Sequence, residues 1–508
     1  MIKKIEKKLA HGIPFLITIF FLSFSGLNTF AQNNINRQTQ KGIDALYNFE
    51  FDEAEKIFDE MIETSPDNPT AYHYKSVPYL WLYLDSKNDE NLTSFLSYSE
   101  SVINKSQQLI ESEPGNPYYY YLIGTTYSYR ALAFARSEEY LNALWATKNF
   151  FSYLNSALEI DSSYYDAFLG LGIYNFAASQ TAPAWKWALE LTGISGDKNI
   201  GFEYLNLSAK KGTWSKIEAR FYLSQLLSEF FLDLKTAEKY LQELSRKYPG
   251  NLLFKLAIAE LNIKKVELSG AEKKLREILD PPDTLFKQIN CYSKFSLANI
   301  FFFENNFDSA LVYYKDFLKS SSDNHFKGIA AFRSGLCYSF TGQSEEAQLF
   351  FELTSEGNMD LDEDRYAKAK SEQYLENPPD SIELKLHFIN NLIRSGKYKA
   401  AIDSVAVVLR DSISADLKGT ALLYLSDALY FNNKFKESLN NALTAFKVEN
   451  SERWIKPFAC YFAARASHKL NNNLDANLFI RYAGNYSDYF YENKLKNLLY
   501  SLSYSINK

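Results

Sequence analysis

GIDALYNFEFDEAEKIFDEMIETSP, from Gly42 to Pro66, is the stretch of sequence that decides the fold. It opens with a small residue and an apolar pair, passes through a short polar turn, and then places Ala54 four residues before Phe58. Pro66 closes the unit, because a residue that precedes proline avoids the helical region. The stretch therefore predicts two helices joined by a tight turn.

The same template recurs along the chain, in LANIFFFENNFDSALVYYKDF from Leu297 to Phe317 and in GLCYSFTGQSEEAQLFFELT from Gly335 to Thr354. Each copy carries the alanine and, four residues later, the aromatic residue. The equivalent positions are Ala310 with Tyr314 and Ala347 with Phe351, with partial copies around Ala401 and Ser438. Self-similarity at a fixed spacing indicates a repeat architecture.

The pattern resembles the tetratricopeptide repeat (TPR), a helix-turn-helix unit of about 34 residues. Small residues let two antiparallel helices approach, and the aromatic residue of each second helix fills the space toward the next hairpin. One hairpin cannot bury its apolar face alone, so hairpins stack. We predict an all-α, TPR-like solenoid, a right-handed superhelix of about ten hairpins. They are expected to start near Ile35, Ala71, Tyr118, Tyr164, Lys216, Leu252, Gln288, Lys327, Ser381 and Leu417, with a final pair from Ile455 to Ser503.

The composition agrees with a helical chain. Gly 20 and Pro 13 among 508 residues amount to about half of average usage. Sandwiches, barrels and propellers need far more turn formers, so these classes are excluded. The net charge of −6 gives no reason to expect a nucleic-acid partner.

The N-terminus reads as a signal peptide over residues 1–31. Four lysines precede an apolar core from Ile13 to Leu22, and Ala31 supplies the small residue before Gln32. Its removal takes the net charge from −6 to −9, because four lysines and one glutamate leave. We expect a protein exported to the periplasm or to the periphery of the outer membrane of a bacterium. The alternative is that the segment remains as an anchor.

Proline pairs are the best linkers in the remaining chain. Pro281-Pro282 and Pro378-Pro379 each end one helix and start another. We expect an N-terminal TPR-like block over residues 32–280 and a C-terminal one over residues 281–508.

Residues 164–214 break the repeat pattern. The segment contains Gly170, Gly172, Pro183 and then Gly193-Ile-Ser195-Gly196-Asp197, with Gly201 four residues after the aspartate. This order resembles the inclusion-body-clearance family of TPR proteins, over residues 115–230. Eukaryotic members of that family associate with the mitochondrial outer membrane or lipid droplets, and no enzymatic activity is established for it. The resemblance implies a TPR fold and a scaffold-like role.

Two interpretations of this segment stay open. In one, its glycines permit close helix crossing and its tryptophans pack in the core. In the other, Trp185, Trp187, Ser195 and Asp197 form a ligand or partner site at a helix N-terminus. Either Ser195 or Asp197 is the expected N-cap of the following helix.

No catalytic or metal-binding motif is found in the sequence. The histidines lie far from one another and from cysteine, which argues against a metal site. Cys291, Cys337 and Cys460 are too widely spaced for a disulfide framework and are expected to be buried thiols. The acidic run from Asp360 to Asp364 lacks the glycine and terminal glutamate of a calcium loop, so we read it as a solvated helix start. No cofactor and no catalysis are predicted.

Tyrosine runs mark a candidate partner surface. Neighbouring residues on a helix point about 100° apart, so the four tyrosines from Tyr118 to Tyr121 cannot all face inward. First helices line the concave side of a TPR superhelix, and aromatic and arginine residues suit binding hot spots. The candidate groove residues are Tyr119, Tyr120, Tyr127, Arg130 and Tyr165. We expect a scaffold that binds a protein or peptide in this groove. The alternative is a carbohydrate-binding protein, which exposed rings at Trp185 or Trp187 would favour.

Overall fold

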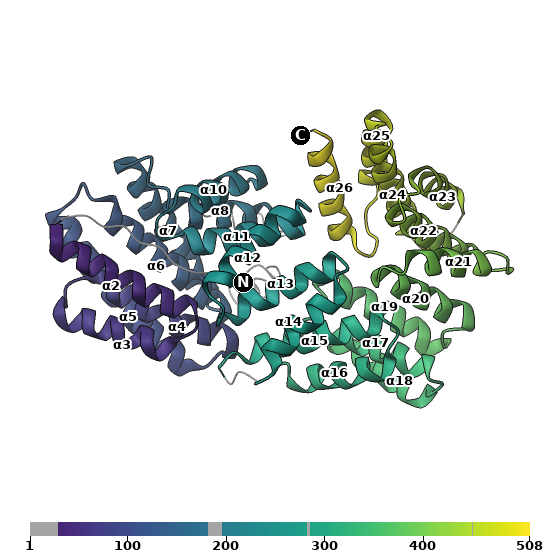
Figure 1. The fold of residues 1–508 in the computed structure, drawn as a ribbon, viewed down its shortest axis with the longest axis horizontal. Coiled ribbons are helices and arrows are strands. Elements are labelled where there is room, and N and C mark those ends of the chain that lie inside the picture. The colour runs from purple at the N-terminus through teal and green to yellow at the C-terminus, as the bar shows by residue number, and fades with distance from the viewer. Residues whose placement is uncertain (1–28, 181–195, 282–284, 450, 508) are drawn as a thin grey trace. The chain divides into compact units, whose positions relative to one another are not determined.

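The computed structural model describes residues 29–180, 196–281, 285–449 and 451–507, with side chains from residue 37 onward. Every regular element in these ranges is a helix. The chain divides into two compact units (Figure 1). Unit 1 consists of the chain up to Leu227 with Lys235–Ile258 and Asp283–Ile289, and unit 2 of Ser228–Leu234, Ala259–Pro282 and Asn290–Lys508.

Unit 1 is built from successive helical hairpins. Each hairpin start that the sequence predicted lies at the beginning of a helix or close to it. Its helices are α2 (Thr29–Tyr47), α3 (Phe51–Thr64), α4 (Pro69–Ser86), α5 (Asp89–Ser112), α6 (Pro117–Arg136), α7 (Tyr140–Ile160), α8 (Ala167–Ser179), α10 (Lys198–Lys211), α11 (Lys216–Glu229), α12 (Leu234–Lys247) and α13 (Leu252–Lys264). Helices α11 and α13 end in unit 2, and α12 begins there with Leu234.

Unit 2 follows the same scheme. Its helices, of which α15 begins in unit 1, are α14 (Leu268–Leu279), α15 (Lys287–Phe303), α16 (Phe307–Ser320), α17 (Lys327–Phe340), α18 (Ser344–Glu352), the 3₁₀ turn η2 (Leu353–Glu356), α19 (Asp362–Glu376), α20 (Ser381–Arg394), α21 (Tyr398–Val408), α22 (Ala415–Phe431), α23 (Phe435–Lys447), α24 (Ile455–Lys469), α25 (Asn473–Gly484) and α26 (Glu492–Ile506). The prediction of an all-α helical-repeat solenoid is confirmed.

Small and aromatic residues interlock as the repeat template predicts. A Cβ atom added to Gly42 would lie 2.5 Å from the Phe58 ring, and one added to Gly335 would lie 2.5 Å from the Phe351 ring. Ala54 and Ala310 are fully buried. At these two positions the helices of the hairpin therefore approach so closely that only glycine fits opposite the aromatic ring without displacing it.

The turns within the hairpins share one geometry. In α17–α18, Gly342 has φ +76° and the amide of Gln343 donates to the carbonyl of Tyr338 at 2.9 Å. This is the pattern in which a left-handed residue satisfies the last carbonyls of a helix. Gly396 with Lys397 repeats it, and Asn305, Asn433 and Asn471 take the left-handed position in other hairpins. Glycine and asparagine recur there because they adopt positive φ at low cost. Phe49, Glu138 and Val266 take the same position in three further hairpins.

The glycines of segment 164–214 allow α8 and α10 to cross closely. A Cβ on Gly201 would lie 2.7 Å from the backbone nitrogen of Phe176, and one on Gly172 would lie 3.0 Å from the carbonyl oxygen of Gly201. The packing interpretation of these glycines is therefore confirmed.

Carboxylates from one helix cap the start of another. Asp166 is buried and accepts from the amides of Thr213, Trp214 and Ser215 at 2.9–3.0 Å, directly before α11. Burial raises the pKa of Asp166, and these hydrogen bonds act in the opposite direction. Asp85 likewise accepts from Lys287 and Gln288 at the start of α15, at 2.9 Å each. Helix starts leave unpaired amides, which these carboxylates satisfy.

The acidic run 360–364 was correctly read as a helix start, but its solvation was wrongly predicted. Asp364 is fully buried and accepts from the amides of Ile329 and Asn358 at 2.8 Å. Asp362 is also buried and accepts from the amide of Lys494 at 3.3 Å. These acids cap distant helix starts instead of facing water. Burial raises the pKa of Asp364 to about 6.

One element was not anticipated. The sequence predicted a final pair from Ile455 to Ser503, where the structure has α24, α25 and α26. The predicted buried thiols are confirmed at Cys291, Cys337 and Cys460.

Gly335→Ala tests the interlock. The added methyl group meets the Phe351 ring, which also packs against Tyr374 with ring centroids 5.6 Å apart. Such overpacking costs about 1–3 kcal/mol, so Tm of the unit 2 transition is expected to fall by roughly 2–10 °C in calorimetry. The control is Gly484→Ala, whose added Cβ would touch nothing within 4 Å. Equal Tm values for the two variants would contradict the interlock.

Candidate partner-binding surfaces

The tyrosine run at the start of α6 is split between core and surface. Tyr118 and Tyr121 are buried, whereas Tyr119 and Tyr120 are half-exposed. This division follows from helical geometry and leaves Tyr119 and Tyr120 accessible to a partner.

Further along α6, Tyr127 and Arg130 are buried. The Arg130 guanidinium donates to the Ser99 hydroxyl at 2.9 Å and to the Glu100 carboxylate at 2.5 Å, both on α5. Through these hydrogen bonds, Arg130 joins α6 to α5 within the hairpin stack.

The remaining predicted residues lie near the segment break. Tyr165 is half-exposed, and Lys211 donates to its hydroxyl at 3.1 Å. Asp197 is the N-cap of α10, accepting from the amides of Asn199 and Ile200 at 2.7 and 3.0 Å. Trp185, Trp187 and Ser195 lie outside the described residues. Exposure of the Trp185 or Trp187 ring, which would favour carbohydrate binding, therefore stays a prediction. Partner binding by the whole set therefore stays a prediction.

First helices of unit 1 converge on one buried carboxylate, Glu218 of α11. The Tyr47 hydroxyl of α2 donates to it at 2.8 Å, and the Tyr129 hydroxyl of α6 donates at 3.5 Å. Burial, followed by the charge of Glu218, raises the pKa of both tyrosines. His73 of α4 stacks on Tyr129, and its burial lowers its pKa to about 3.

Helix α2 is tied to the α12–α13 region by further bonds. Asp44 accepts from Lys247 and from the Tyr248 hydroxyl, each at 2.9 Å. The Asn251 side chain donates to the carbonyl of Tyr47 at 2.8 Å. The first hairpin of unit 1 therefore contacts helices about 200 residues later in the sequence. Together with the contacts around Glu218, this buries the side chains of Tyr47, His73 and Tyr129 in an interior.

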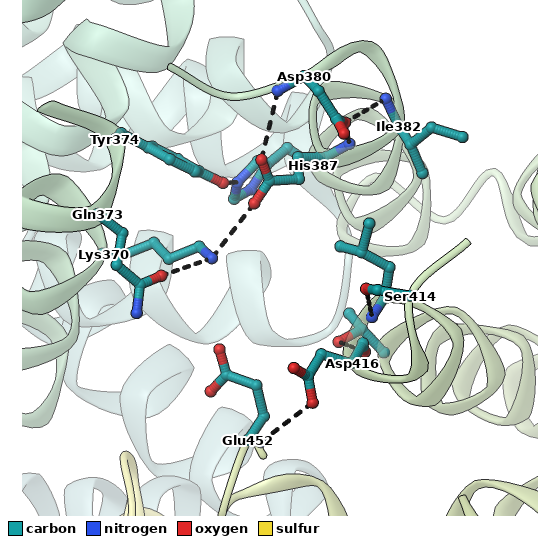
Figure 2. A network of polar contacts seen from close by, with 12 residues as sticks. Lys370, Gln373, Tyr374, Asp380, Ile382, His387, Ser414, Asp416 and Glu452 are labelled. Atoms are coloured by element: carbon teal, nitrogen blue, oxygen red, sulfur yellow. Dashed lines mark hydrogen bonds and ion pairs between the residues drawn. The ribbon is translucent and has the colours of Figure 1, made fainter. Parts of the chain in front are cut away.

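Unit 2 contains a polar network across α19, α20 and α22 (Figure 2). Lys370 of α19 pairs with Glu383 of α20 at 3.3 Å, and both side chains are 20% exposed. The Tyr374 hydroxyl and the His387 Nε2 atom lie 3.0 Å apart. The structure thus brings together side chains from two successive helices that the sequence analysis did not select.

The carboxylates of this region are held in place by a helix terminus or a loop. Glu383 accepts from the amide of Asp380, while Asp380 accepts from the amides of Ile382 and Glu383, forming a capping box at the start of α20. Asp416 of α22 accepts from the Ser451 amide and hydroxyl at 2.6 Å each. The carboxylates are therefore fixed in direction before any partner binds.

The charges that act on the pKa values of Tyr366 and His387 indicate which further residues lie close to the Lys370–Glu383 pair. Burial raises the pKa of Tyr366, and the charges of Glu452 and Glu383 act in the same direction. Burial, with Lys370 and Arg333 nearby, lowers the pKa of His387 to about 3, so this ring is neutral at pH 7. Figure 2 shows Lys370, His387, Asp416 and Glu452 around one region. We define the unit-2 surface as the half-buried residues Tyr366, Lys370, Glu383, His387, Asp416 and Tyr424.

The sequence carried a signal for this surface. Tyr366 and Lys370 are four residues apart on α19, and Glu383 and His387 are four apart on α20. Residues at this spacing share one helix face. The sequence predicted a helix start in the acidic run 360–364, but nothing in it indicated which face of that helix lies toward α20.

In the described ranges, no group of three or more metal-ligating side chains comes together. Nor does any helix of those ranges have the length and apolar content needed to span a membrane.

Comparisons with known proteins agree with the helical-repeat architecture. A model of the Iml2/Tetratricopeptide repeat protein 39 family matches residues 148–388. No curated protein matches the chain significantly.

Several solved structures resemble the chain at low identity. Yeast Tom70 is 12% identical, with a TM-score of 0.29 and coverage of 94% of this chain and 96% of that chain. The apo form of the quorum sensor NprR from B. thuringiensis is 12% identical, with a TM-score of 0.31 and coverage of 89% and 99%. A TPR protein from Parabacteroides merdae is 15% identical, with a TM-score of 0.25 and coverage of 56% and 98%.

The family match extends further toward the C-terminus than the residues 115–230 that carried the resemblance in the sequence. Together with the interlocked hairpins, it identifies the architecture. The chain is a tetratricopeptide-repeat protein that resembles the Iml2/Tetratricopeptide repeat protein 39 family.

Proposed function

We propose that this TPR-type scaffold binds a peptide segment of a protein partner across the unit-2 surface. The observation that carries the proposal is the convergence of half-buried charged and aromatic side chains from α19, α20 and α22. Partly desolvated aromatic and charged residues are the usual anchors of protein interfaces. In unit 1, by contrast, the first-helix residues Tyr47 and Tyr129 are buried around Glu218.

The Lys370–Glu383 pair suits recognition of a peptide group, which offers one acceptor and one donor. The Lys370 ammonium has three N–H donors. It gives one to Glu383 and one to the Gln373 side chain, at 3.3 and 2.9 Å. The third is left for a partner carbonyl, and Glu383 retains lone pairs for a partner N–H. Tyr366 and Tyr424 add flat apolar area at low entropic cost.

The proposed mechanism contains no bond-making step. Binding relies on shape complementarity, hydrogen bonds to the fixed charges and burial of aromatic area. TPR-like scaffold families are generally non-catalytic. The mixed charge of the surface favours a partner segment that carries both signs of charge.

We further propose that binding takes place outside the cytoplasm, in the cell envelope. The support is the basic and apolar N-terminal segment followed by Ala31. Protein recovered from the envelope is expected to begin at Gln32 when its N-terminus is sequenced by mass spectrometry. A recovered chain that still carries residues 1–31 would contradict cleavage.

Partner capture tests the unit-2 surface. The chain from Gln32 onward serves as bait in an envelope extract, and captured proteins are quantified by mass spectrometry. The double variant Lys370→Ala/Tyr424→Ala is expected to reduce capture of the specific partner by about 5- to 30-fold, since hot-spot truncations cost roughly 1–2 kcal/mol. Lys385→Ala, an exposed site on α20, is the matched control and should capture as the native chain does.

The double variant Tyr119→Ala/Tyr120→Ala is measured in parallel. If it alone loses the partner, the binding surface lies on α6 and the unit-2 proposal is wrong. Circular dichroism of every variant confirms that the helical fold is retained.

A further inference from the structure

Trp145 of α7 is the most exposed tryptophan in the described ranges. It is 54% exposed, whereas Trp81 and Trp214 are buried and Trp454 is half-buried. Leu141, four residues earlier, is 62% exposed and shares its face of the helix. Large apolar side chains that gather at the surface mark a place where another molecule binds.

Contacts from three helices hold the Trp145 ring. The Tyr127 ring of α6 meets it nearly at a right angle, with centroids 5.3 Å apart, and Tyr153 of α7 stacks on Tyr127 at 5.9 Å. The Gln107 amide of α5 donates to the Tyr153 hydroxyl at 3.3 Å. Helices α5 and α7 both pack on α6. We call Gln107, Leu141, Trp145 and Tyr153 the Trp145 platform, which is in position before any ligand binds.

The surroundings of the platform are polar but almost uncharged. Among the exposed residues of α7 from Leu141 to Asn155, Lys148 is the single charge. Among those of α5 from Ser97 to Gln108, the single charge is Glu100, which pairs with Arg130. The other exposed polar residues of these two stretches carry a hydroxyl or an amide: Ser97, Asn104, Gln107, Gln108, Asn142, Ser152 and Asn155. The platform therefore presents aromatic area among neutral hydrogen-bonding groups.

We propose that the Trp145 platform binds a neutral oligosaccharide. A pyranose ring has a face of C–H groups that packs against an aromatic ring, and a rim of hydroxyls that pair with amides. Each sugar hydroxyl both donates and accepts, and so does an amide side chain. The Gln107 amide gives one of its two N–H groups to Tyr153. Its second N–H and its carbonyl oxygen then serve the sugar hydroxyls.

Other classes of ligand fit these groups less well. A polyanion, such as a nucleic acid or an acidic polysaccharide, would meet Lys148 as the single exposed cation of these two stretches. An apolar protein segment could cover Leu141 and Trp145, but it would also bury the surrounding amides without partners, which is unfavourable. A neutral sugar pairs with those amides. The platform lies in unit 1, so this proposal does not depend on peptide binding at the unit-2 surface.

Saturation-transfer NMR of the chain from Gln32 onward tests the platform, with maltohexaose, cellohexaose and xylohexaose as probes. At least one of them is expected to bind with Kd on the order of 0.1–1 mM, since one stacked ring and a few hydrogen bonds give a modest affinity. Trp145→Ala is expected to weaken this Kd about 5- to 10-fold, because it removes the stacking surface. Tyr482→Ala, which truncates a 48% exposed aromatic residue of α25, is the matched control and should bind as the native chain does.

Two further variants separate a sugar site from an apolar one. Trp145→Phe keeps an aromatic face and is expected to retain part of the affinity that Trp145→Ala loses. Gln107→Leu keeps the size of the side chain but removes its amide, so Kd for the sugar is expected to weaken about 3-fold or more. A site for an apolar protein segment would be unchanged or strengthened by the added leucine.

The outcomes that overturn the proposal are distinct from one another. Absence of binding by all three hexasaccharides would overturn it, and so would equal Kd values for Trp145→Ala and the native chain. Unchanged or tighter sugar binding by Gln107→Leu would overturn the assignment of the amides to sugar hydroxyls. Circular dichroism of every variant verifies that the helical fold is retained.

Discussion

One buried carboxylate organises unit 1. Glu218 has almost no contact with water and receives hydrogen bonds from Tyr47 and Tyr129, which lie on two other helices. A carboxylate buried without such partners would cost several kcal/mol, so its donors must arrive in the right geometry. This requirement fixes α2, α6 and α11 against one another. It also places first-helix aromatic residues such as Tyr47 and Tyr129 in an interior, whereas Tyr119 and Tyr120 stay half-exposed.

Carboxylates have a second role in both units, as caps of distant helix starts. Asp166 and Asp85 in unit 1, and Asp364 and Asp416 in unit 2, each bind backbone amides far away in the sequence. Hairpin interlocking alone sets the distance between neighbouring helices, whereas these caps fix where along the chain distant segments meet. Asp416 belongs to the unit-2 surface itself, so the same bonds that hold the fold also orient a candidate binding group.

The end of unit 2 depends on similar contacts. Helix α26 is anchored by Asp362, and its Ser501 hydroxyl donates to the carbonyl of Phe231 at 2.9 Å. Helix α26 also packs against α24 and α25. Packing and capping are thus linked at the final hairpin.

Local repetition made the fold predictable from the sequence, and long-range contacts limited the prediction of the site. Gly42 and Phe58, or Gly335 and Phe351, are 16 residues apart and recur, so their pairing was foreseen. The burial of Tyr127 and Arg130 depends on the stacking of whole hairpins. Glu218 is 171 residues from Tyr47, and nothing in either segment indicates the other. Similarly, Asp362 and Asp364 look like a solvated acidic run until their distant amide partners are known.

The Tyr47–Glu218 hydrogen bond is the most direct test of this account. A double-mutant cycle with Tyr47→Phe and Glu218→Gln, followed by calorimetric unfolding of unit 1, isolates the coupling between the two side chains. A hydrogen bond to a charged group contributes about 1.5–3 kcal/mol, and we predict a coupling free energy in that range. A coupling indistinguishable from zero would contradict the convergence of the first helices on Glu218.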